Sequence, residues 1–379
     1  MLVYLDNAAT TPIASEVIDA MLPILKNEYG NPSSMHSFGR NAKALIEVSR
    51  RSIAGHLNCK PSEIIFTSGG TEADNMGLHS AVNQMGVKQI ITSRLEHHAI
   101  GNTVTEIEKS NKARISYVKV DKKGTVDLED LERLLDTEDK TLVCLMHANN
   151  EIATLLPLEK VSSICRKYNA LLHSDTVQTM GHYHFDLKKL DIDFMTGAAH
   201  KFHGPKGIGF LYVNENAKVE PLIYGGLQER GHRSGTENVY GIAGLSKAMD
   251  LTYEDLKEHQ KHVQGLKTYM INELKKEFED ISFYGDIDPD RSLYTILNVC
   301  FPATSKSSML LFTLDLKGVA VSGGSACSSG ASQGSHVLEG IGADMSRPNV
   351  RFSFSRYTTK KEIDYALNQV IAVYEKNLS

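Results

Sequence analysis

EIIFTSGGTEADN, residues 63–75, joins a short β-rich run to a glycine turn and then to a segment in which apolar residues have helical spacing. The same alternation continues to about residue 215, so it predicts βαβ units and an α/β fold with a mostly parallel sheet covered by helices on both faces. LVCLM is apolar at every position, as expected of a strand buried on both sides. The seven predicted strands are EIIFT (63–67), QIITS (89–93), ISYVKV (115–120), LVCLM (142–146), ALLHSD (170–175), DFMTG (193–197) and GIGFLYV (207–213).

Beyond this sheet the pattern changes. Apolar residues keep helical spacing through Leu245, Met249 and Leu266, which predicts long helices that lead into a second region. Three further β-rich runs then precede an amphipathic segment near 359–376. We therefore predict a smaller α+β domain from about residue 260 onward.

The composition excludes several classes of protein. The 379 residues include 41 Lys+Arg and 46 Asp+Glu, a net charge of −5, which does not favour a general binder of nucleic acid or of anionic membranes. No apolar run approaches the ~18 residues of a membrane span, and the opening MLVYLDNAATTP does not resemble a signal peptide, so we expect a cytoplasmic protein. The five cysteines are odd in number and form no C-x-x-C pair, which argues against a disulfide framework and a thiolate zinc site.

The glycine turn Ser68-Gly69-Gly70-Thr71 follows a predicted strand and begins a predicted helix. Free backbone N–H groups and the positive end of the helix macrodipole make such a turn a site for a phosphate group. No Lys-Ser/Thr follows the glycines, so this is not a Walker loop. Taken alone, the same residues are also typical of an ordinary capped βα turn.

A second motif, AAHKFHGPKG (198–207), follows the predicted strand DFMTG and contains Lys201 in a Gly/Pro-rich turn. Ligands of α/β sheets bind at the carboxyl ends of the strands, where a lysine can be desolvated enough to attack a carbonyl group. Taken alone, a lysine in such a turn is more often a surface residue. His200 and His203 have no carboxylate or thiolate partner at a fixed spacing, so we predict no metal site.

The third motif, HSDTVQ (173–178), places Asp175 at the end of another predicted strand. An aspartate there often caps a helix, but it is also the group that keeps the ring nitrogen of a pyridoxal cofactor protonated. Asp175 and Lys201 are 26 residues apart, about one βαβ step. Both side chains are therefore expected at one edge of the sheet.

The fourth motif, SGGSACSSG (322–330), surrounds Cys327 with small residues. Nothing bulky shields its sulfur, which suits a nucleophile that must reach a substrate. The other four cysteines lie in apolar context or beside a Lys-Pro pair, which favours buried or incidental positions.

Taken together, these residues resemble the NifS/IscS-like cysteine desulfurases of the class V aminotransferase family. The matching stretches follow the family order over nearly the whole chain. They are LDNAATTP (5–12), GNPSSMHSFGR (30–40), TSGGTEADN (67–75), LEHHA (95–99), NNEIAT (149–154), HSDTVQ (173–178), HKFHGPKGIG (200–209), RSGTEN (233–238), SGGSACSSG (322–330) and VRFSFSRYTT (350–359).

The resemblance implies the fold of the aminotransferase-like (fold type I) enzymes that depend on pyridoxal 5'-phosphate. A large cofactor-binding domain would comprise residues 15–259, and a small domain of 1–14 and 260–379 would carry the cysteine loop. The cofactor would be bound covalently to Lys201 and stacked under His97, and Arg351 would hold the substrate carboxylate together with Asn150. The implied cofactor-binding residues are Gly70, Thr71, His97, Asn150, Asp175, Gln178, His200, Lys201 and, from a neighbouring subunit of a homodimer, Thr236.

The implied reaction converts L-cysteine to L-alanine. Lys201 would take the α-proton, and the Cys327 thiolate would attack the substrate sulfur to form a persulfide for a sulfur acceptor in iron–sulfur cluster assembly, thio-cofactor synthesis or tRNA thiolation. Alternatives are a selenocysteine lyase, another class V enzyme that uses pyridoxal phosphate, or a catalytically silent scaffold of the same fold. An aminotransferase has no use for Cys327, and a silent scaffold predicts damage at Lys201, Asp175 or Cys327 that is not seen.

Three positions depart from the family pattern. Ala198 stands where members usually carry a serine, whose hydroxyl would donate a hydrogen bond to the cofactor phosphate. We therefore expect a weaker hold on the phosphate, unless Thr196, a backbone N–H or water supplies the missing donor. Gly323 and Ala153 replace the commoner Ser and Gly, which are minor changes.

Overall fold

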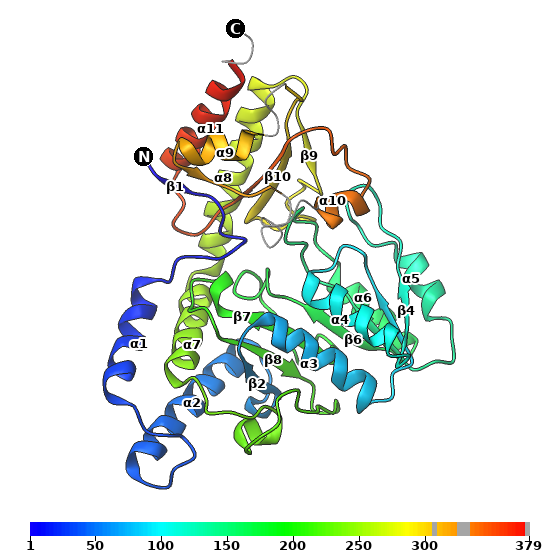
Figure 1. Cartoon of the computed structure of the whole chain (residues 1–379), viewed down its shortest axis with the longest axis vertical. Coiled ribbons are helices and arrows are strands. Elements are labelled where there is room, and N and C mark those ends of the chain that lie inside the picture. The colour runs from blue at the N-terminus through cyan, green and yellow to red at the C-terminus, as the bar shows by residue number, and fades with distance from the viewer. Residues whose placement is uncertain (305–308, 324–333, 376–379) are drawn as a thin grey trace.

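The computed structural model describes residues 1–304, 309–323 and 334–375, and Figure 1 shows their arrangement. The large sheet has seven strands in the order β2-β8-β7-β6-β5-β3-β4. Their bounds are β2 Ile64–Thr67, β3 Gln89–Thr92, β4 Arg114–Tyr117, β5 Thr141–Cys144, β6 Leu171–Asp175, β7 Phe194–Ala198 and β8 Gly209–Val213. All seven predicted strands are confirmed.

One strand runs against the others. β8 pairs antiparallel with both β7 and β2, whereas the remaining neighbours pair in parallel. The connection from β7 to β8 covers residues 199–208, which contain one 3-10 turn, η2 (Ala199–Lys201), and no helix that could cross over to a parallel neighbour. The predicted mostly parallel sheet is therefore correct, with β8 as its exception.

Helices cover both faces of this sheet, as predicted. On one face α3 (Gly70–Asn83) and α4 (His98–Lys109) pack Met76, Leu78 and Val104 against the strands. The opposite face is covered by helices that share a second cluster of buried side chains. They are α1 (Ser15–Asn27), α2 (Ser37–His56), α5 (Leu128–Leu135), α6 (Leu158–Lys167) and α7 (Val239–Glu254).

A separate core lies in the upper part of the molecule in Figure 1. A three-stranded antiparallel sheet, in the order β12-β10-β9, packs there with the last helices, and the N-terminal β1 pairs in parallel with β11. The predicted domain boundary at residue 260 falls within α8, which begins at Leu256 and continues upward from α7. No break in the helix marks this boundary, so it stays a proposal. The elements here are β1 Val3–Tyr4, α8 Leu256–Glu277, β9 Ser282–Tyr284, β10 Ile296–Cys300, α9 Leu310–Leu316, β11 Val319–Ala320, α10 His336–Gly340, β12 Asn349–Ser353 and α11 Lys360–Glu375.

Two features of this arrangement bear on function. The carboxyl ends of β2, β3, β5, β6 and β7 meet at one edge of the large sheet, facing the region of β10 and β12. The N-terminal segment after β1 passes across this edge, where Thr11 N and Thr11 Oγ1 both donate hydrogen bonds to the backbone oxygen of His200.

Within the described residues, no helix combines the length and the apolar character that a membrane crossing requires.

Candidate active site

A cavity of about 340 Å³ lies at the carboxyl edge of the large sheet. Each segment that follows one of the converging strands contributes to its wall, and Arg351 closes it from β12. The wall contains Ala8, Ala9, Gly70, Thr71, Asp74, His97, His98, Met146, Asn150, Glu151, Asp175, Val177, Gln178, Ala198, His200, Lys201, His336 and Arg351. Eight of the nine residues predicted to bind the cofactor are therefore brought together.

Lys201 lies on η2, directly after β7, and its side chain is only partly exposed. Its Nζ donates to the backbone oxygens of Ala8 (2.5 Å) and Ala9 (2.9 Å). Gln178 Nε2 donates to the same oxygen of Ala8, at 3.1 Å. The N-terminal segment thus holds the lysine amine inside the cavity by two main-chain carbonyls.

Asp175 ends β6 and is buried, and its Oδ1 accepts a hydrogen bond from Val177 N at 2.9 Å. Burial and the neighbouring Asp74 carboxyl raise the pKa of Asp175, whereas a protonated His97 would oppose that shift. A cationic ring nitrogen beside Asp175 would favour its charged form in the same way.

His97 caps α4, because its Nδ1 accepts a hydrogen bond from Ala99 N at 3.1 Å. Burial lowers the pKa of His97, and the nearby Lys201 lowers it further. The ring is therefore neutral near pH 7, which suits stacking on an aromatic cofactor better than a cationic ring that repels Lys201.

The N-terminus of α3 opens into the cavity at Gly70 and Thr71. Its N-cap is Gly69, which has no side chain to satisfy the first N–H groups of the helix. A Cβ on Gly70 would lie 2.7 Å from Val177 Cγ2 and 3.8 Å from Ala198 Cβ, so nothing larger than glycine fits here. The contact also places Ala198, where a serine is usual in the family pattern, beside the glycine turn.

These groups fit pyridoxal phosphate by their chemistry. One cavity offers an amine for the aldehyde, a buried carboxyl for the ring nitrogen, an imidazole for the ring face and a helix N-terminus for the phosphate. His200 lines the same cavity, with Nδ1 hydrogen-bonded to Thr10 Oγ1 at 3.2 Å, and burial lowers its pKa to about 4.

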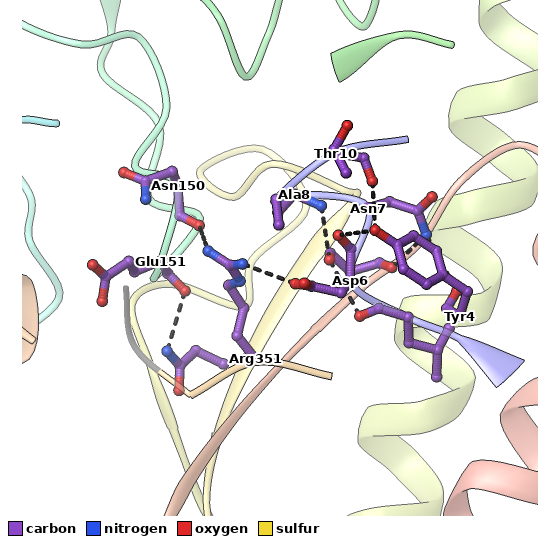
Figure 2. A network of polar contacts seen from close by, with 12 residues as sticks. Tyr4, Asp6, Asn7, Ala8, Thr10, Asn150, Glu151 and Arg351 are labelled. Carbon is purple, nitrogen blue, oxygen red and sulfur yellow. Dashed lines mark hydrogen bonds and ion pairs between the residues drawn. The ribbon is translucent and has the colours of Figure 1, made fainter. Parts of the chain in front are cut away.

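Arg351 on β12 and Asn150 on the segment after β5 both line the cavity, and Figure 2 shows them from close by. Arg351 Nη1 donates to the backbone oxygen of Asn150 at 2.9 Å, and Nη2 forms an ion pair with Asp6 Oδ1 at 3.0 Å. The Arg351 side chain is 1% exposed. Both residues predicted to bind the substrate therefore face the cavity that contains Lys201.

Three acidic residues at the cavity were not predicted. Asp74 and Glu151 line it, and Glu96 accepts hydrogen bonds from Met146 N just behind it. Burial raises the pKa of Asp74 to about 7 and raises those of Glu96 and Glu151 as well. They lie within the stretches TSGGTEADN, LEHHA and NNEIAT, which carry the family resemblance. Their place in these stretches was the signal in the sequence that could have found them.

Among the described residues, one residue predicted to bind the cofactor does not line this cavity. Thr236 lines a separate cavity of about 190 Å³, beside Arg233 and Asn238. Cys327 lies outside the described residues, so its prediction stands on the sequence. His203 also lies apart, with Nδ1 hydrogen-bonded to the backbone oxygen of Pro12 at 2.9 Å.

The four described cysteines have the environment that the sequence predicts. Cys144, Cys165 and Cys300 are buried and Cys59 is partly buried, and all four are free thiols. Burial raises the pKa of Cys59 and of Cys165 to about 12, so neither thiol ionises near neutral pH.

Comparison with known proteins extends this likeness over the whole chain. The aminotransferase class-V family model matches residues 3–366. The cysteine desulfurase IscS of Dictyoglomus turgidum is 43% identical over 379 residues, which cover 99% of this chain and 95% of the relative.

Solved structures agree. One described as a NifS-like protein has a TM-score of 0.91 at 37% identity and covers 99% of this chain and 100% of its own. Another, described as SspA in complex with cysteine, has a TM-score of 0.81 at 28% identity and covers 94% of this chain and 100% of its own. Since sequence, fold and the cavity at the sheet edge agree over nearly the full length, the chain belongs to the class V aminotransferase family and, within it, to the IscS/NifS-like cysteine desulfurases.

Proposed function

We propose that the protein converts L-cysteine to L-alanine with bound pyridoxal phosphate and stores the released sulfur as a persulfide on Cys327. The observation that carries the proposal is the meeting of Lys201, Asp175, His97 and Arg351 in one cavity. A persulfide is a product to be transferred, so we further propose a sulfur-acceptor protein as partner.

Four groups would hold the cofactor. Lys201 would bind its aldehyde carbon, Asp175 its ring nitrogen and Gln178 its ring oxygen, while Gly70 and Thr71 would bind its phosphate at the N-terminus of α3. When bound, pyridoxal phosphate supplies an electron sink for a substrate carbon that loses a proton. The buried Asp175 maintains that property because its negative charge favours a protonated ring.

The remaining residues act on the substrate. Arg351 would bind the α-carboxylate, for which a guanidinium group offers parallel N–H donors, and the backbone oxygen of Asn150 keeps the group in place. The Lys201 amine would accept the α-proton, a step that geometry favours because its Nζ lies in the same cavity. His97 shields the site from the α4 side.

Sulfur transfer requires Cys327 to reach this cavity. On one side of its loop, Ser322 pairs with Arg351 through the backbone, since Arg351 N donates to Ser322 O at 2.6 Å. On the other side, Ser335 Oγ donates to Glu151 Oε2 at 2.5 Å, and Glu151 lines the cavity. Cys327 is five residues from Ser322 in the sequence, a span of at most ~18 Å, which would allow its thiol to approach the cavity.

The thiolate of Cys327 would attack the sulfur of the substrate. The Cβ–Sγ bond of the substrate then breaks, its electrons stay with the three-carbon fragment that becomes alanine, and the sulfur remains on Cys327 as a persulfide. A reductant or an acceptor thiol removes that sulfur and restores the cysteine.

A direct assay tests the proposal. The holoenzyme incubated with L-cysteine and a thiol reductant should release sulfide and alanine in equal amounts, each measured separately. Without the reductant, turnover should stop after about one equivalent per site, since the persulfide is not removed. Alanine without sulfide, or no product from L-cysteine, would refute the proposed reaction.

We also propose a homodimer in which Thr236 completes the cofactor site of the partner subunit. Thr236 does not reach the cavity of its own chain. Large apolar side chains are exposed near it, with Tyr224 80% and Leu227 88% exposed. Contiguous exposed apolar surface marks an interface, and we propose that these side chains contribute to one. Other exposed side chains on α1 and on the segment into α2 are Ile18, Leu22, Leu25, Tyr29, Met35 and Phe38.

Complementation tests the shared site. Thr236→Ala and Lys201→Ala each damage every site of their own homodimer. After subunit exchange, a heterodimer should contain one wholly native site, so the mixture should recover up to about a quarter of the parent activity when subunits assort at random. Native mass spectrometry should demonstrate the exchange. Exchange without recovery would show that Thr236 serves its own subunit.

A further inference from the structure

Arg351 already has a carboxylate partner inside the cavity wall. Its Nη2 lies 3.0 Å from Asp6 Oδ1, and the side chains of Arg351 and Asp6 are 1% and 18% exposed. In Figure 2 the guanidinium group lies between Asp6 on one side and Asn150 on the other. The Asp6 carboxylate therefore occupies a guanidinium nitrogen of Arg351 that a substrate carboxylate would use.

The fold builds this ion pair through the backbone. Asp6 pairs in parallel with Ser353, two residues beyond Arg351 on β12. Ser353 N donates to Leu5 O at 2.7 Å, and Ala8 N donates to Ser353 Oγ at 2.9 Å. Asn7 Nδ2 donates to Ser353 O at 2.9 Å. Asp6 is thus fixed beside Arg351 and is not a flexible surface partner.

Among the described residues, Asp6 is the carboxylate that neutralises the charge of Arg351. Glu151 is the other acidic group near it, but burial raises the pKa of Glu151 and so favours its uncharged form. A buried guanidinium group without a counter-ion is costly. Arg351 Nε is buried and has no hydrogen-bond partner among the described residues, so the donors of the guanidinium group are not all satisfied by the protein.

We propose that Asp6 sets the affinity of Arg351 for carboxylate ligands by competing with them for the guanidinium group. Asp6 neutralises Arg351 when no substrate is bound and weakens its hold on the α-carboxylate when substrate or product is present. The inference rests on the proposed function, because it takes Arg351 as the partner of that carboxylate. Its consequence is that L-alanine, which carries the same carboxylate as L-cysteine, leaves the site readily.

Binding of L-alanine to the holoenzyme tests this role without turnover. Titration followed by the absorbance of the bound cofactor gives the dissociation constant, and L-alaninamide, which lacks the negative charge, serves as the matched ligand. Asp6→Asn should lower the dissociation constant of L-alanine roughly tenfold, the effect of one charge-assisted contact. The constant for L-alaninamide should change less than about twofold, because that ligand does not compete for the charge.

Asp280→Asn is the matched control variant. It removes a carboxylate from another arginine ion pair, Arg347–Asp280 at 3.1 Å, and its side chain is 76% exposed. It should leave both dissociation constants unchanged. Asp6→Ser, which also removes the charge, should reproduce the selective gain of Asp6→Asn and covers the case in which the asparagine variant folds poorly.

Two results would overturn the proposal. One is unchanged or weaker binding of L-alanine in both folded Asp6 variants, and the other is an equal gain for L-alanine and L-alaninamide. Arg351→Gln, which removes the positive charge, separates this failure from that of the proposed function. If that variant keeps the parent preference for L-alanine over L-alaninamide, Arg351 does not bind the carboxylate, and the assignment on which the role of Asp6 rests is wrong.

Discussion

Lys201→Ala should abolish covalent retention of pyridoxal phosphate and lower the release of sulfide and alanine from L-cysteine. Loss of the proton acceptor alone should reduce the rate roughly 10²–10⁴-fold, and loss of the covalent bond to the cofactor adds to it. We expect this result because Lys201 Nζ is held within the cavity by the backbone oxygens of Ala8 and Ala9.

Borohydride reduction followed by peptide mapping checks this assignment. In the parent protein the pyridoxyl label should lie on Lys201. Lys206→Ala is the matched control, since Lys206 is exposed in the same turn and does not line the cavity. That variant should keep both the label and the activity. A label on Lys206 in the parent would refute the role of Lys201.

The large sheet was predictable because its strands are buried on both faces. β5, for example, is buried at every position from Thr141 to Cys144, so its apolar run is visible without any knowledge of its partners. The same regularity explains why Asp175 and Lys201 could be placed together. Asp175 ends β6 and Lys201 follows β7, and parallel neighbours end at the same edge.

The N-terminal wall of the cavity was not predictable in this way. Lys201 contacts Ala8 and Ala9 from more than 190 residues away, and it does so through main-chain oxygens. Every residue has a backbone carbonyl, so such a contact leaves no pattern in the side chains. LDNAATTP (5–12) was recognised by resemblance alone, which gave no reason to single out Asp6 as the partner of Arg351.

The acidic residues at the cavity were missed for a related reason. Asp74 lies one turn into α3 and Glu96 just before α4, where acidic residues usually face solvent or cap a helix. Their burial depends on how α3 and α4 pack on the sheet. The pKa of Asp74, raised to about 7, is therefore a property of the tertiary structure and not of the local sequence.

Cys327→Ser should stop the release of both sulfide and alanine while leaving cofactor binding and L-cysteine binding intact. A serine hydroxyl is a far weaker nucleophile than a thiolate near neutral pH, and its oxygen cannot form a persulfide. Under the proposed function, the substrate carboxylate would be bound by Arg351, which lines the cavity. The expected loss of turnover is therefore complete within detection, whereas the absorbance change on adding L-cysteine should persist.

Cys59→Ser is the control for this variant. Cys59 is partly buried at the end of α2, and burial raises its pKa to about 12, so its thiol does not supply a thiolate near pH 7. Its replacement should leave turnover near that of the parent. Mass spectrometry of the parent after L-cysteine without reductant should find the added 32 Da of one sulfur on the peptide that contains Cys327. Parent-like turnover by Cys327→Ser would show that sulfur leaves the substrate without this cysteine. The four described cysteines could not replace it, because none of Cys59, Cys144, Cys165 and Cys300 lines the cavity.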